Sequence, residues 1–418
     1  METTENNDLS KSLESITVDE SIAEDILATQ ADTAVVVGTV SDYLTAKGDA
    51  KLYNINLPAG VYLQAQLTTP ANADLDYDLY LLDAEGNILT GSDYYTYING
   101  TAGTLPEALG YITSGDTATY YLYVLASEGG SVSESFTLDY SVSTACDSYE
   151  IDESVRQALA FTYGAGGAYI ESRNLSSPID NDWYVITVPS SRIYDKLKIS
   201  ATTASTNTCS VEVYQNVASE GYQMKRVGSG NTISVSSGKY YIRVSNAKTM
   251  ENFDDLDIQN YKLSITPILK ATGIVITDLK GSEGLNKVVN YPGYGAHFRT
   301  QGSGTLTVYG VLTATDSSTG VTYAVGGEQI NGLYYSPAWE ANNTSANAIR
   351  RGTGTTDSSG KFEIDISLPP GIGVYSYYGS TSTHYFDICG VSVSPSDDSS
   401  ISASETIFHL AYTMYHPF

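Results

Sequence analysis

The chain has 418 residues, enough for about three domains of ordinary size, and 41% of them are hydrophobic, so each domain can bury a core. The 21 basic and 48 acidic residues give a net charge of −27, which repels nucleic acid and anionic membrane surfaces and argues against both as partners. No stretch approaches the roughly 20 apolar residues that span a bilayer, so no membrane insertion is expected.

The polar N-terminus, METTENNDLSKS, does not read as a signal peptide. We expect residues 1–14 to be disordered. The acidic composition fits an exported protein, extracellular or on the cell surface, whose native leader was removed and replaced by a start Met for expression. Helical periodicity is confined to residues about 10–30 and a short stretch near 153–161.

Elsewhere the chain consists of short alternating runs rich in Val, Ile, Thr and Tyr, separated by Gly, Asn, Asp and Ser. Runs such as KLYNINL, YYLYVLA and KFEIDISL predict an all-β protein made of antiparallel sandwiches. The 35 tyrosines fit half-buried strand positions, where the ring packs inward and the hydroxyl reaches water.

An internal repeat divides the first two thirds of the chain. Landmarks recur in the same order at offsets of roughly 120–135 residues, as expected when strands are kept and loops change length. The matched segments are DESI (19–22) with DESV (152–155), YNINLP (53–58) with YVITVP (184–189), DLY (78–80) with EVY (212–214), YYLYV (120–124) with YYIRV (240–244), and FTL (136–138) with YKL (261–263). We therefore predict one β-sandwich at 15–144 and a second copy at 145–268.

These landmarks resemble the bacterial pre-peptidase C-terminal (PPC) domain. The resemblance rests on DSYEIDES (147–154), DNDWY (180–184) and GKYYIRV (238–244) in the second copy, and on DYDLYLLD (76–83) in the first. It implies jelly-roll-like sandwiches that assist secreted hydrolases in secretion, stability or attachment. Some collagen-binding relatives of that family hold calcium where the leading segment folds against the sheet. The first copy departs from the pattern at DAKLY (49–53), where the second has DNDWY.

Region 269–418 has a different pattern. The segments TLTVYG (305–310), DSSTG (316–320) and TDSSGKFEI (356–364) predict strand, hairpin and strand. The TDSSGKF segment resembles bacterial immunoglobulin-like and carboxypeptidase-regulatory-like domains, so we expect an immunoglobulin-like sandwich that serves as a spacer or adhesion unit.

Calcium is the best-supported cofactor. Carboxylates gather at the start of the second copy and just before its second strand, and calcium prefers six to eight oxygen ligands. We predict a site formed by Glu150, Asp152, Asp180 and Asp182. Calcium is less expected in the first copy, because Lys51 replaces the second aspartate. The alternation Asp74, Asp76, Asp78 is expected on a solvated sheet face.

Aromatic residues in Gly- and Ser-rich contexts are candidate ligand-binding residues, because loop aromatics can stack on sugars or anchor a protein. Packing of these rings over a sandwich end is the alternative. The candidates are Tyr94, Tyr95, Tyr97, Tyr334, Tyr335, Trp339, Tyr377 and Tyr378.

Catalytic patterns are weak. All four histidines lie in the third region. A zinc site that uses His384 and His409 is an alternative there, but no H-x-x-x-H spacing exists. Cys146 and Cys209 either pair or, as we favour, stay free.

Because no catalytic pattern is strong, we expect a non-catalytic accessory protein with an attachment or structural role, acting on an extracellular protein or polysaccharide. The alternatives are a carbohydrate-binding protein that uses the loop tyrosines, and a metal-dependent hydrolase.

Overall fold

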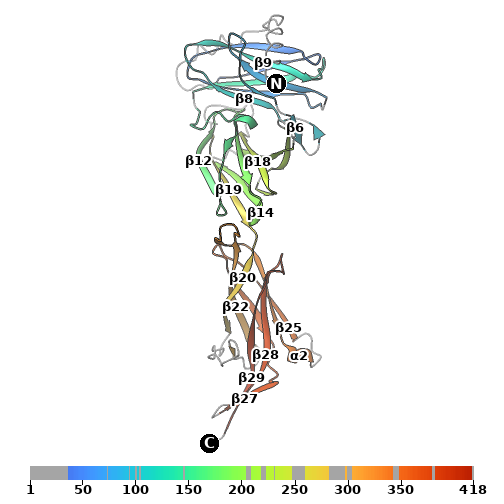
Figure 1. Cartoon of the computed structure of the whole chain (residues 1–418), viewed down its shortest axis with the longest axis vertical. Coiled ribbons are helices and arrows are strands. Elements are labelled where there is room, and N and C mark those ends of the chain that lie inside the picture. The colour runs from blue at the N-terminus through green and yellow to red at the C-terminus, as the bar shows by residue number, and fades with distance from the viewer. Residues whose placement is uncertain are drawn as a thin grey trace. The chain divides into compact units, whose positions relative to one another are not determined.

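A computed structural model describes residues 36–416, apart from 73, 94, 99–100, 103–104, 145, 204–208, 218–222, 230, 247–258, 282–296, 299–303, 342–347 and 379–381. The fold is all-β, as predicted, and is built from antiparallel sheets facing one another (Figure 1). The chain divides into two compact units, Met1–Ser190 with Lys196–Ile268, and Ser191–Asp195 with Leu269–Phe418. Both predicted copies fall in the first unit, and the division into three domains stays a prediction.

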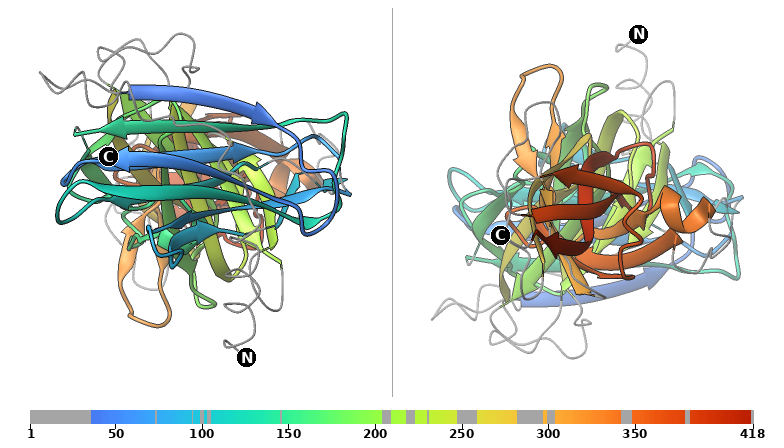
Figure 2. Two further views of the ribbon diagram at one scale, coloured as in Figure 1. Left: turned by 90° about the horizontal axis from the view of Figure 1, so that it is seen from above. Right: turned by 90° about the horizontal axis from the view of Figure 1, so that it is seen from below.

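The first sandwich encloses a core of alternating inward residues, among them Tyr53, Leu79 and Leu122. Figure 2 shows its long strands, in blue and teal, lying side by side. One sheet is β1 (Val36–Asp42), β10 (Phe136–Ser143), β3 (Tyr62–Thr68) and β8 (Glu107–Ile112), in spatial order. The facing sheet is β2 (Ala50–Leu57), β9 (Ala118–Glu128), β4 (Asp76–Leu82) and β5 (Ile88–Ser92).

The second sandwich begins with a single 3-10 turn, η1 (Val155–Gln157), within the stretch where a short helix was expected. One sheet is β12 (Ala168–Leu175), β19 (Gln259–Leu269), β14 (Tyr194–Thr203) and β17 (Thr232–Ser234). The other is β11 (Leu159–Ala160), β13 (Asn181–Val188), β18 (Gly238–Asn246), β15 (Cys209–Asn216), β16 (Gln223–Ser229), β6 (Tyr95–Ile98) and β7 (Thr101–Ala102).

The strand order confirms the predicted repeat. The order β2-β9-β4-β5 of the first sandwich recurs as β13-β18-β15-β16, and β1-β10-β3-β8 recurs as β12-β19-β14-β17. Register agrees as well, because Tyr53 lies opposite Leu122 and Tyr184 lies opposite Ile242. The alternating pattern that each copy shares in sequence therefore produces the same topology twice.

One hairpin crosses from the first copy to the second. Strands β6 and β7 come from the first copy, yet β6 pairs in parallel with β16, with Tyr95 opposite Gln223. Leu105, just beyond the hairpin, packs with Trp183, Tyr214 and Met224 of the second copy. We call β6, β7 and Leu105 the clasp.

The second unit is also a two-layer structure with its own core. One layer is β20 (Gly273–Gly281), β22 (Gly304–Thr315) and β23 (Thr322–Ala324), with β26 (Lys361–Leu368) paired to β22. The other is β21 (His297–Phe298), β29 (Ala403–Tyr415), β28 (Ser382–Pro395), β24 (Gln329–Tyr335) and β25 (Ile349–Thr355), with β27 (Tyr375–Tyr378) paired to β28. A short helix, α2 (Pro337–Ala341), follows β24.

Local chemistry explains these elements. In β26 every second residue is buried, from Phe362 to Leu368, as strict alternation predicts. The turn before it is closed by the Asp357 carboxylate, which accepts the amides of Ser359 and Lys361 at 2.8 and 3.0 Å. Gly360 there has φ +74°, a conformation that glycine adopts without strain.

Four predictions concern features other than the arrangement of the sheets. The helix expected near 10–30 and the disorder expected for 1–14 lie outside the described residues. Cys146, Cys209 and Cys389 are not joined in disulfide bonds. Among the described residues, no helix has the length and apolar character needed to cross a bilayer.

Candidate functional site

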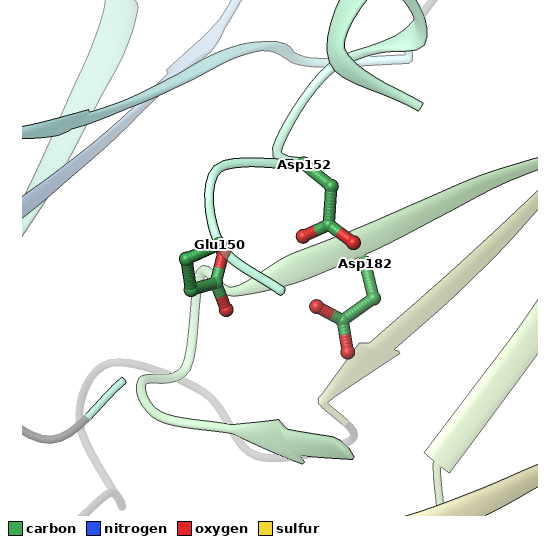
Figure 3. A group of neighbouring side chains, drawn as sticks. All are labelled: Glu150, Asp152 and Asp182. Carbon is green, nitrogen blue, oxygen red and sulfur yellow. The ribbon is translucent and has the colours of Figure 1, made fainter. Parts of the chain in front are cut away.

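The predicted calcium ligands converge at the start of the second sandwich. Glu150 and Asp152 lie on the segment before η1, residues 147–154, which we call the lead-in segment. Asp182 lies on β13, to which the lead-in segment is tied by a hydrogen bond from the Trp183 amide to the Asp152 carbonyl, 3.0 Å. One oxygen from each of Glu150, Asp152 and Asp182 lies within 4.8 Å of the other two, and Figure 3 shows these carboxylates around a common space.

Asp180 is close by but faces its own turn. One carboxylate oxygen accepts the amide and hydroxyl of Ser176, the latter at 2.8 Å, while Oδ1 is buried without a hydrogen-bond partner. Glu150 Oε1 and Asp152 Oδ1 are buried without partners too. Buried acceptors of this kind call for a donor or a cation.

A buried arginine that the sequence analysis missed occupies one side of the cluster. The Arg173 guanidinium lies 2.7 Å from Asp147 Oδ1 and 2.8 Å from Asp182 Oδ1, and it also contacts Asp152. Its Nε donates to the Tyr184 hydroxyl at 2.7 Å. Arg173 therefore supplies one positive charge where the sequence predicted only a metal.

A strand irregularity turns Arg173 inward. The pairing of β12 with β19 shifts between Ile170 and Arg173, and Ser172 has φ +64°. Arg173 is in phase with the buried Leu175, and this alternation is the signal from which the sequence analysis could have placed Arg173 on the inward face.

The opposite side of the cluster is held by the first sandwich. The Tyr62 hydroxyl lies 2.7 Å from Glu150 Oε2 and 2.5 Å from Glu153 Oε1. The Gln64 amide nitrogen donates to Glu153 Oε1 at 2.6 Å, and the Asn181 backbone amide donates to Glu153 Oε2 at 2.9 Å. Glu153 directly follows the predicted ligand Asp152 in the same acidic segment.

The cluster holds more negative charge than its surroundings compensate. The cluster contains six carboxylates, and among the described residues one guanidinium, that of Arg173, forms ion pairs with three of them. The six belong to Asp147, Glu150, Asp152, Glu153, Asp180 and Asp182. Burial, and then the charge of Asp180, raises the pKa of Glu150 to about 8. Burial likewise raises the pKa of Asp152, Glu153 and Asp182. The site favours either protons or an added cation.

The acidic positions of the first copy are used differently. The Asp49 carboxylate closes its own turn by accepting the amides of Thr45 and Ala46 at 2.9 and 3.0 Å. Lys51 pairs with Asp42 at 3.0 Å.

In the acidic alternation of β4 and the residues before it, Asp74 is exposed but Asp78 is buried. Burial, together with the charge of Asp76, raises the pKa of Asp78 to about 7. The expectation of a solvated face was therefore wrong for Asp78.

The predicted aromatic residues do not share one surface. Tyr94 lies outside the described residues, while Tyr95 and Tyr97 belong to the paired strand β6 rather than to a loop. Tyr334 is fully buried on β24, so its prediction as a ligand-binding residue was wrong. The run GLYYS continues the β24 alternation, which directs this ring into the core.

Tyr335 and Trp339 are half-buried and held by local bonds. The Tyr335 hydroxyl donates to Glu340 on α2, and Trp339 Nε1 donates to the Pro370 carbonyl at 2.9 Å. Their contacts fit the alternative of rings packed at a sandwich end.

Exposed rings gather instead where β27 and β29 end. Tyr377 lies in β27, and Tyr378 beside it is 71% exposed. Tyr375, Met414 and Tyr415 are 50, 51 and 73% exposed. Thr383 on β28 lies opposite both Tyr378 and Met414, so these two residues lie on the two strands that flank β28. We call Tyr375, Tyr378, Met414 and Tyr415 the aromatic tip.

The histidine proposed as a zinc ligand is part of the core. His409 is buried, and its Nδ1 lies 3.0 Å from the Tyr334 hydroxyl. Burial lowers the pKa of His409 to about 4 and raises that of the neighbouring Cys389 thiol to about 11. These shifts keep the imidazole and the thiol neutral and disfavour a nucleophilic cysteine.

Comparisons with known proteins add little about function. No family model matches the chain. The uncharacterized protein YlqB of Bacillus subtilis is 36% identical over 74 residues, which are 18% of this chain and 46% of that protein. The chain thus spans about half the length of the curated relative it matches.

Similar solved structures overlap weakly with this chain. The lysozyme inhibitor PliG of Aeromonas hydrophila matches at 9% identity and a TM-score of 0.18, over 26% of this chain and 87% of PliG. The tandem CBM22 domains of Paenibacillus barcinonensis Xyn10C match at 10% identity and 0.17, over 57% of this chain and 94% of theirs. The Bacillus licheniformis lipase BlEst2 in propeptide form matches at 9% identity and 0.19, over 80% and 44%. Scores this low carry no functional argument.

Proposed function

We propose that the chain is a non-catalytic accessory protein that acts outside the cell in attachment or as a structural spacer, and that calcium stabilises its first unit. The carrying observation is the group of buried, unpartnered oxygens on Glu150, Asp152 and Asp180 beside a single guanidinium. All of these candidate ligand atoms are oxygens. Oxygen ligands suit calcium better than zinc, because zinc prefers nitrogen and sulfur. We also propose that the two sandwiches of the first unit are PPC-like domains, since the sequence resemblance implies the same accessory role.

The calcium proposal is tested by thermal unfolding of the full chain in EDTA and in millimolar calcium. Sodium chloride should match the ionic strength, because a chain of net charge −27 is also stabilised by screening. Calcium at 100 times its Kd adds about 2.7 kcal/mol to the folded state, so one transition should rise by several degrees. Magnesium should have less effect, because it sheds its water reluctantly.

Two matched variants locate the effect. Glu150→Gln removes a charge from the cluster and should abolish most of the calcium shift. Glu134→Gln changes an exposed residue of the same unit, whose carboxylate accepts the Asn72 amide at 3.0 Å, and should leave the shift intact. An unchanged transition in the unmodified protein, or an equal shift in both variants, would refute the assignment.

The aromatic tip favours a second candidate function, binding of a polysaccharide or protein ligand in the second unit. Exposed tyrosine rings are good platforms for sugar stacking and protein contact. In affinity electrophoresis with neutral polysaccharides, retardation should be lost on Tyr378→Ala or Tyr415→Ala and kept on Tyr43→Ala, which alters an exposed tyrosine of the first unit. Equal mobility of all four proteins on a broad panel would remove this candidate.

A further inference from the structure

The carboxylate cluster has two sides with different compensation. On one side, Asp147, Asp152 and Asp182 contact the Arg173 guanidinium. On the other, no described arginine or lysine forms an ion pair with Glu150, Glu153 or Asp180. A cation is therefore needed most on the second side.

That second side is completed by the first sandwich. Tyr62 and Gln64 are two residues apart on β3, so both side chains leave the same face of the sheet, and both are buried against Glu153. Gly110 on the adjacent strand β8 permits this approach. A Cβ at Gly110 would lie 2.7 Å from Glu153 Cγ and 2.7 Å from the Tyr62 hydroxyl.

The two ends of the Gln64 side-chain amide are used unequally. Its amide nitrogen donates to Glu153, while its carbonyl oxygen Oε1 is buried without a partner. Glu150 Oε1 is also buried without a hydrogen-bond partner. Asp180 Oδ1 has no close donor either, although the Gln64 amide lies near enough to the Asp180 carboxylate to oppose the rise in its pKa. These groups are acceptors only, so none can satisfy another, and amide carbonyls and carboxylates are the ligands that calcium takes.

We propose that the calcium site is shared between the two sandwiches, with the Gln64 carbonyl oxygen of the first sandwich binding the same ion as Glu150 and Asp180 of the second. This inference rests on the proposed function and extends it. The ion then acts as a joint, because it satisfies acceptors that belong to different copies of the repeat.

The test is calorimetric titration of the full chain with calcium chloride. Gln64→Met keeps the length of the side chain and removes the carbonyl oxygen. It should weaken calcium binding about tenfold or more, the usual range for losing a metal-site partner. Gln66→Met is the control, because Gln66 lies on the same face of β3 and its carbonyl oxygen already accepts the Asn181 side-chain amide at 3.2 Å. Its calcium affinity should equal that of the unmodified protein.

Each outcome separates the shared site from the calcium proposal itself. If the unmodified protein binds no calcium, both ideas fall. If it binds calcium and Gln64→Met binds equally well, the site belongs to the second sandwich alone. Equal weakening by both variants would trace the effect to packing of the two sandwiches and overturn the shared ligand. Gln64→Asn, which shortens the amide by one methylene, repeats the test if the methionine variant fails to fold.

Discussion

At the scale of single residues, Arg173 most changes the interpretation of the acidic cluster. The buried Arg173 guanidinium forms ion pairs with three carboxylates and compensates part of their negative charge. Without it, these carboxylates would be buried without a counter-ion. The guanidinium carbon also lies 5.0 Å from the centroid of the Tyr149 ring, over its face. This cation–π contact helps to hold the guanidinium in place. Arginine suits this place because its planar, permanently charged group can bind several carboxylates at once.

Replacing Arg173 should therefore be costly. In EDTA, Arg173→Met leaves buried carboxylates uncompensated and should lower the free energy of unfolding by about 3–5 kcal/mol. Arg226→Met is the comparison, because Arg226 lies 3.1 Å from Glu212, which keeps Arg243 at 3.3 Å, and this change should cost less than about 1 kcal/mol. Urea denaturation measures both, and equal losses would show that Arg173 is not the internal counter-ion.

At the scale of elements, the sheet of β24, β28 and β29 carries a polar end inside the second unit. Asp387 on β28 is buried and accepts the backbone amides of Ile372, Gly373 and Val374 at 2.6, 2.7 and 3.1 Å. His409 on β29 lies opposite it. The Asp387 carboxylate thereby fixes the chain leading into β27, the strand that presents the aromatic tip.

This polar end should make the second unit sensitive to acid. Burial lowers the folded pKa of His409 to about 4, although Asp387 opposes the shift. The unfolded chain therefore binds a proton below about pH 6.5 that the folded chain refuses. The stability that the neutral imidazole contributes is complete above pH 6.5 and declines as pH falls toward 4, by about 3 kcal/mol at most.

The variant His409→Asn isolates this effect. Its side chain can still meet the Tyr334 hydroxyl but does not titrate. Chemical denaturation between pH 7 and 4 should show a steeper loss of stability in the unmodified protein than in the variant. If the free energy of unfolding falls equally with pH in both proteins, protonation of His409 is not the cause of the acid sensitivity.

At the scale of the whole molecule, the sequence predicted the fold class and the repeat, because both are written in strand alternation and in the order of landmarks. It predicted Asp152 and Asp182 as ligands of one ion because carboxylates gather both at the start of the second copy and around the beginning of β13. It missed Arg173, whose direction depends on the irregularity at Ser172, and it missed Tyr62 and Gln64. These two meet Glu153 across 91 and 89 residues of chain, a contact set by how two sandwiches join and not by any local pattern.

The clasp has a consequence for how such a chain is inherited. Duplicated domains are ordinarily parts that recombination can cut apart, multiply or move into other genes. Here strand β16 of the second copy pairs with β6, and the hydrophobic cluster around Trp183 of the second copy includes Leu105. Both β6 and Leu105 belong to the first copy. A gene fragment that carried the second copy alone would encode an uncovered strand edge and a bare aromatic face. The two copies have become a single heritable part.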